Sequence, residues 1–72
     1  MIDFDMVRAD FDALNETLRA ARMRSVGMII QYVVSGPKVV IVTPRETVTY
    51  GTLADAHLAL NAMRMIAGLL RL

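Results

Sequence analysis

The 72-residue sequence contains no cysteine and no tryptophan, and it has a single histidine, His57, and a single lysine, Lys38. Without cysteine, the chain can form no disulfide bond, no thiolate metal site and no cysteine nucleophile. One histidine excludes a multi-histidine metal site, and the four glycines form no phosphate-binding loop motif. We therefore expect a protein that is not an enzyme and that requires no metal or other cofactor.

The sequence also lacks an excess of charge of one sign. Eight lysines and arginines stand against seven aspartates and glutamates, so the net charge at pH 7 is +1. A chain so close to neutral offers no electrostatic reason to bind nucleic acid or an anionic membrane surface. We expect neither as the main partner.

No hydrophobic run in the sequence is long and unbroken enough to span a membrane. Residues 53–72 are rich in leucine, alanine and methionine, but they include Asp55 and Arg64, and charged side chains are costly inside a bilayer. The first five residues include two aspartates and no basic residue, and no apolar run follows them, unlike a secretory signal. We therefore expect a cytoplasmic protein.

Apolar side chains, in contrast, are abundant, at 56% of all residues. A chain of this length forms a single domain, residues 1–72, which can bury only about 60% of the surface of its unfolded state. The sequence therefore carries more apolar side chains than one small domain can hide. We expect a second copy of the chain or another protein to cover the remainder.

The first predicted element is an amphipathic helix. Its apolar residues recur at steps of three and four, and Asp3 precedes them as a candidate N-cap. We expect the helix to end at residues 25–27. The predicted apolar face consists of Phe4, Val7, Phe11, Leu14, Leu18 and Ala21.

Two β-branched segments, residues 28–34 and 39–43, then flank a turn predicted at residues 35–38, as in an antiparallel hairpin. Neither segment alternates cleanly between apolar and polar residues, so we expect both faces of the hairpin to be covered, one by the helices and one by a partner. Pro44 is expected to end the second strand. Residues 46–50 form either a third strand or a continuation beyond a bulge.

A second helix is predicted from an N-cap at Thr52, in a capping box with Asp55, to a point close to Leu72. Its polar residues recur at steps of four and three and predict a narrow stripe that faces water: His57, Asn61, Arg64, Gly68 and Arg71. The rest of its circumference is apolar, which is typical of a buried helix. The predicted homodimer interface, shared with the outer face of the hairpin, comprises Leu58, Met63, Met65, Ile66, Leu69 and Leu70.

A second set of residues is a candidate for contact with another partner. Tyr32 and Tyr50 lie in extended segments, and tyrosines often anchor interfaces. Arg19, Arg22 and Arg24 could contact phosphates or an acidic surface, or could simply complement the end of the first helix and pair with Glu16. Two further sets of residues are expected to be solvated surface residues without a site: His57, and Asp10 with Asp12.

The stretch Thr47-Val48-Thr49-Tyr50-Gly51-Thr52-Leu53-Ala54-Asp55 resembles the segment of the small head-to-tail joining proteins of lambda-like phages that leads from a strand through a Thr/Ser-rich turn into the last helix. That resemblance implies a helix–hairpin–helix fold and a structural role in the virion. In its size and plan the chain is also similar to small phage proteins that bind host regulators, such as anti-activators of quorum sensing.

We therefore expect an α+β fold, a helix–β-hairpin–helix with a two- to three-stranded antiparallel sheet, assembled as a homodimer. The expected function is that of a phage-encoded, non-enzymatic interaction protein that binds and modulates or inhibits a host regulatory protein. The alternative is a structural virion component of the joining type. A third candidate is a weak DNA-binding regulator that uses Arg19, Arg22 and Arg24.

Overall fold

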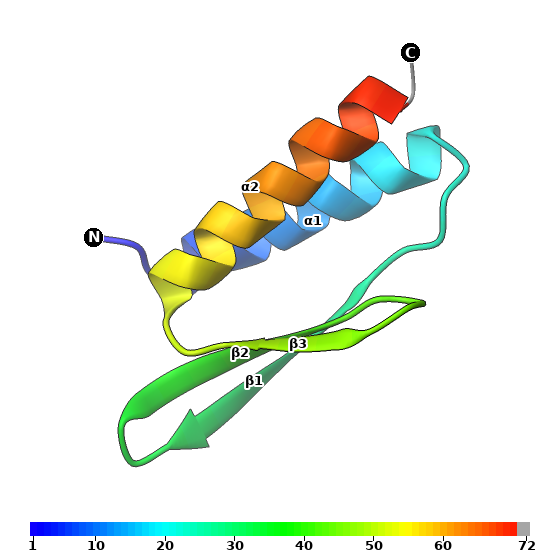
Figure 1. Cartoon of the computed structure of the whole chain (residues 1–72). Coiled ribbons are helices and arrows are strands. Elements are labelled where there is room, and N and C mark those ends of the chain that lie inside the picture. The colour runs from blue at the N-terminus through cyan, green and yellow to red at the C-terminus, as the bar shows by residue number, and fades with distance from the viewer. Residues whose placement is uncertain (71–72) are drawn as a thin grey trace.

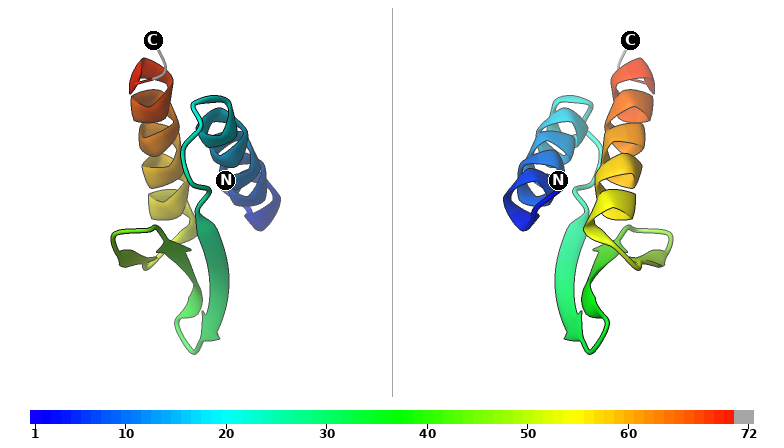
Figure 2. Two further views of the ribbon diagram at one scale, coloured as in Figure 1. Left: turned by 90° about the vertical axis from the view of Figure 1, so that its right-hand side faces the viewer. Right: turned by 90° about the vertical axis from the view of Figure 1, so that its left-hand side faces the viewer.

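The computed structural model describes residues 1–70 and confirms the α+β fold class (Figure 1). Two helices lie side by side in one layer, and a three-stranded antiparallel sheet forms the other (Figures 1 and 2). Along the chain the elements are α1 (Phe4–Ala20), β1 (Gly27–Val33), β2 (Gly36–Val42), β3 (Thr47–Tyr50) and α2 (Leu53–Leu70). Arg71 and Leu72, which the sequence places in the last helix, lie outside the described residues.

The sheet has the order β1-β2-β3, with β2 paired to both neighbours. Residues 47–50 form a third strand: Tyr50 lies opposite Val39, and Thr47 lies opposite Val42. Pro44 stands in the turn between β2 and β3, as predicted. Because three strands of alternating direction carry the chain back to the end of the molecule at which α1 begins, α2 runs parallel to α1 (Figure 1).

The hairpin turn is shorter than the sequence predicts, since only residues 34 and 35 connect β1 to β2. The chain reverses at Gly36, whose backbone φ of 119° is one that residues other than glycine rarely adopt. Pro37 and Lys38 therefore belong to β2 and pair with Tyr32 and Gln31. β3 pairs with β2 only from Val39 onward, so no third strand lies beside Pro37. The N–H that proline lacks is therefore not needed for a hydrogen bond to β3.

Helix α1 begins as predicted, because Asp3 accepts a hydrogen bond from the backbone N–H of Met6 at 2.9 Å. It ends at Ala20 rather than at residues 25–27. Met23 N donates to the carbonyl of Leu18 at 2.8 Å and Arg22 N donates to that of Arg19 at 3.0 Å, the two bonds of a Schellman motif. Arg22 occupies the left-handed position of this motif, with a φ of 58°.

Helix α2 begins at the predicted cap. Asp55 N donates to Thr52 Oγ1 at 3.1 Å, and Ala56 N donates to the carbonyl of Thr52 at 3.2 Å. The helix then continues to Leu70, the last residue that the structure describes.

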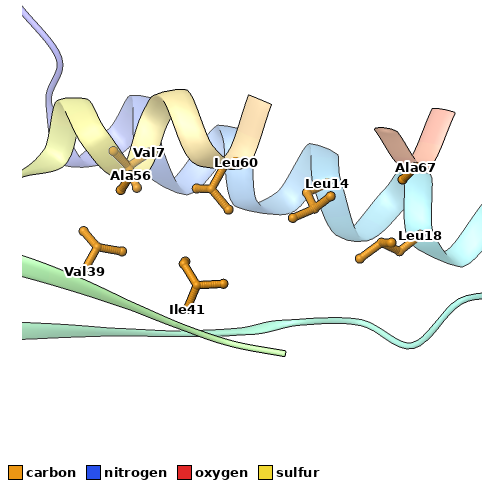
Figure 3. Close-up of a cluster of buried hydrophobic side chains, with 8 residues drawn as sticks. All are labelled: Val7, Leu14, Leu18, Val39, Ile41, Ala56, Leu60 and Ala67. Carbon is orange, nitrogen blue, oxygen red and sulfur yellow. The ribbon is translucent and has the colours of Figure 1, made fainter. Parts of the chain in front are cut away.

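The core lies between the two helices and the inner face of the sheet. Val39 and Ile41 of β2 point at the helices, as Figure 3 shows, and both are inaccessible to water. No polar side chain is buried among residues 1–70. Phe4, expected in the core, lies in the first turn of α1 and is 39% exposed. The buried cluster consists of Val7, Leu14, Leu18, Val39, Ile41, Ala56, Leu60 and Ala67.

The segment between α1 and β1 is fastened by Asn15, a residue for which the sequence suggested no role. Its amide oxygen accepts a hydrogen bond from Val26 N at 2.8 Å, and its amide nitrogen donates to the carbonyl of Val26 at 3.1 Å. One side chain thus satisfies both backbone groups of a residue that is half-buried beside the core. Residues 21–26 are held against α1 although they form no regular structure.

We expect Asn15→Ala to lower the free energy of unfolding by about 2 kcal/mol, because it leaves the N–H and the carbonyl of Val26 without partners. Urea denaturation at a fixed protein concentration measures the change. Glu16→Ala removes only an exposed ion pair with Arg19 and is the matched control, with an expected change below about 0.5 kcal/mol. Equal effects of the two variants would contradict the role assigned to Asn15.

Arg22→Gly should raise the free energy of unfolding by about 0.5–1 kcal/mol, because glycine adopts the left-handed conformation without the strain that a side chain adds. The increase should appear as a higher melting temperature. Arg19→Gly, three residues earlier and inside the helix, should instead destabilise the protein by about 1 kcal/mol. A loss of stability in both variants would show that Arg22 contributes through its side chain.

Candidate functional site

The exposed side of α2 carries most of the predicted dimer interface. Of the six predicted residues, Met63 is the exception, since it is half-buried and packs against the core. The other five each leave more than half of their surface accessible to water: Leu58, Met65, Ile66, Leu69 and Leu70. We refer to these five residues as the α2 face.

Three residues of the α2 face, together with Ala62, form a row with the spacing of a helix–helix seam. Leu58, Ala62, Met65 and Leu69 follow one another at steps of four, three and four, as the core positions of a coiled coil do. None of the four carries a charge. The row is therefore suited to packing against another helix.

The outer face of the sheet is a second apolar surface. The side chains of Ile29, Val33 and Val42 are exposed there. The helices cover the inner face, so this surface lies on the opposite side of the sheet from α2 (Figure 1). The expectation that α2 and the outer hairpin face contribute to one dimer interface stays a prediction, and the two surfaces lie on different sides of the molecule.

The two tyrosines proposed as partner contacts differ in their surroundings. Tyr32 lies near the tip of the hairpin, opposite Pro37, and is 81% exposed. Tyr50 is half-buried and packs against the core cluster. Of the two, Tyr32 is the one whose ring is available to a partner.

The three arginines at the end of α1 do not form one cluster. Arg19 lies 3.5 Å from Glu16 in an exposed ion pair. Arg22 closes the Schellman motif. Arg24 lies further along and lines a groove described next.

This groove, of about 560 Å³, opens beneath the C-terminal halves of the helices. Four segments line it, namely the last turns of α1, the segment that follows α1, the β2–β3 turn and the second half of α2. Figure 3 shows Leu18 and Ala67, two of its lining residues, beyond the point where Val39 and Ile41 reach the helices. The groove marks the place where the helices extend past the core.

His57 is not the solvated histidine that the sequence suggested. Its Nδ1 lies 2.5 Å from Asp10 Oδ2 on α1, and their side chains are 28% and 15% exposed. Asn61 Nδ2 donates to the carbonyl of His57 at 2.8 Å, and Arg64 donates to Asn61 Oδ1 at 3.0 Å. The first part of the polar stripe on α2 thus faces α1 rather than water, because the two helices are parallel and adjacent.

These polar residues do not form a metal site. No group of three or more histidines, cysteines, aspartates or glutamates within residues 1–70 comes close enough to hold a metal ion. The His57–Asp10 pair joins the two helices where the polar stripe of α2 faces α1. A contact between fixed positions on both helices favours one register of α2 on α1.

Comparison with known protein families, with curated proteins and with solved structures finds no match to this chain. Over the described part of the chain, neither helix is long and apolar enough to cross a membrane. A function must therefore be argued from the surfaces themselves.

We expect His57→Ala to lower the free energy of unfolding by about 1–2 kcal/mol, because it leaves the mostly buried carboxylate of Asp10 without its partner. Arg8→Ala is the matched control: it also removes the partner of an aspartate on α1, but Asp12 is 63% exposed. Its expected effect is below about 0.5 kcal/mol. Urea denaturation at neutral pH distinguishes the two, and indistinguishable midpoints would contradict a structural role for the pair.

Proposed function

We propose that this protein is a non-enzymatic interaction protein that pairs with a second copy through the α2 face and, as a homodimer, binds and modulates another protein. The observation that carries this proposal is the exposure of five large apolar side chains on one helix of a small domain. Such a surface is costly to leave in water and is typical of an interaction site.

The accessible surface supports the proposal. The chain exposes 5,075 Å², whereas a compact monomer of its mass exposes about 4,450 Å². The α2 face contributes on the order of 600 Å², which is the upper end for the largest apolar patch of a monomer. Two copies that cover this face would bury about 1,200 Å² in total, enough for a specific interface.

The homodimer would leave a second surface free. The outer face of the sheet points away from α2, so two copies joined along α2 would leave this face free for another protein, together with the exposed Tyr32 at the tip of the hairpin. We assign the partner contact to this surface. The phage origin, the cytoplasmic location and the host regulatory partner belong to the same proposal, and the host regulatory partner rests on a resemblance to small phage proteins in size and plan.

We expect light scattering over a dilution series to give a mass of twice 8.0 kDa for the unaltered protein and of one chain for Met65→Glu, since a charge would be buried in the seam. Met65 is 69% exposed in the single chain, so Met65→Glu should stay folded by circular dichroism. Thr49→Glu, on the outer face of the sheet, is the control and should remain a dimer.

Other outcomes would overturn this assignment. Dissociation by Thr49→Glu but not by Met65→Glu would move the dimer contact to the sheet. A folded monomer or a large ring for the unaltered protein would favour the virion component. Salt-sensitive DNA binding that is lost when Arg19, Arg22 and Arg24 are replaced would favour the DNA-binding regulator.

A further inference from the structure

The groove beneath the C-terminal halves of the helices has the size and lining of a small-molecule site. Its volume of about 560 Å³ lies within the range of ligand pockets. Leu14, Leu18 and Ala67 form its floor and are at most 7% exposed. Val26, Pro44 and Met63 add to the apolar lining, and methionine adapts readily to the shape of a ligand.

The groove is held open by hydrogen bonds in the turns on both of its sides. On one side, the Schellman motif places Met23 beside Leu18, and Asn15 fastens Val26. On the other side, the hydroxyl of Thr43 accepts hydrogen bonds from the backbone N–H groups of Arg45 and Glu46, at 3.3 and 3.0 Å. Such a preformed groove requires little ordering when a ligand enters it.

Two arginines provide the charge at this groove. Arg24 comes from the segment after α1 and Arg45 from the β2–β3 turn, and both line the groove and are exposed. Within residues 1–70 neither forms an ion pair, whereas Arg8 and Arg19 pair with acidic neighbours on α1. The groove therefore combines an apolar floor with two guanidinium groups that have no acidic partner among the residues that the structure describes.

We propose that this groove binds a linear amphiphilic carboxylate, with its aliphatic chain on the floor of Leu14, Leu18 and Ala67 and its head group at Arg24 and Arg45. A guanidinium group matches a carboxylate in charge and in geometry, since it can donate two parallel hydrogen bonds. The aliphatic chain gains from leaving water along an apolar floor. The ligand thus has an anionic end that meets the two arginines and an apolar end that lies on the floor of the groove.

This site adjoins the proposed dimer contact without coinciding with it. Ile66 and Leu70 of the α2 face also line the groove, whereas Leu58, Met65 and Leu69 do not. Ligand binding is therefore expected both in the unaltered protein and in Met65→Glu. If the dimer proposal failed, the ligand proposal could still be tested. If the ligand proposal failed, the dimer proposal could still be tested.

Decanoate, used below the concentration at which it forms micelles, is the probe. Isothermal titration calorimetry should detect saturable binding of one molecule per chain, and backbone chemical shifts should move around Leu18, Val26 and Ala67. The double variant Arg24→Gln/Arg45→Gln should bind at least about tenfold more weakly, because each charge-assisted hydrogen bond contributes strongly. Arg8→Gln, which changes an arginine outside the groove, should bind as the unaltered protein does.

Two further ligands separate the charge from the chain. Decanol should bind more weakly than decanoate, and decyltrimethylammonium should bind most weakly, since it brings a positive charge to the two arginines. Equal affinities for the three ligands, or an unchanged affinity in the double variant, would overturn the proposal. So would the absence of decanoate binding, which would leave the groove to a segment of a partner protein.

Discussion

The fold depends on the contact between the inner side of β2 and the two helices. Val39 and Ile41 are inaccessible to water, and β2 is also the strand that pairs with both other strands. The chain has no cysteine, and no polar side chain is buried within residues 1–70, so this apolar contact is the main source of tertiary stability. A core of this size cannot cover the apolar residues of α2 and of the outer sheet face. The exposed apolar surfaces and the groove are consequences of the same shortage of core.

Features that depend on neighbouring residues were predicted well from the sequence. The cap at Asp3, the cap at Thr52 and the end of β2 before Pro44 each follow from the chemistry of a few adjacent residues. The end of α1 was wrong because Arg22 adopts a left-handed conformation that glycine usually supplies, and no local signal indicates this. The hairpin turn was wrong because proline inside a strand is uncommon, and it is tolerated here only where β3 has already ended.

The candidate site was predictable only in part. The apolar composition of α2 predicted an interface, but an apolar circumference does not tell which side of the helix meets the core. Met63 was therefore assigned to the interface, although it packs against the core. The pair of Asp10 and His57 spans 47 positions and depends on the parallel direction of the helices, which only the third strand determines. The groove was missed for the same reason, since the segments around it meet only in the folded chain.

The parallel direction of the helices has an electrostatic consequence for any assembly along α2. Each helix carries a dipole equivalent to about half a positive charge at its N-terminus and half a negative charge at its C-terminus. In this fold the two dipoles point the same way and add (Figure 1). Within the described residues the last turn of α2 has no basic side chain to offset its negative end. A second copy therefore fits best when it runs antiparallel, with the positive end of each helix pair beside the negative end of the other.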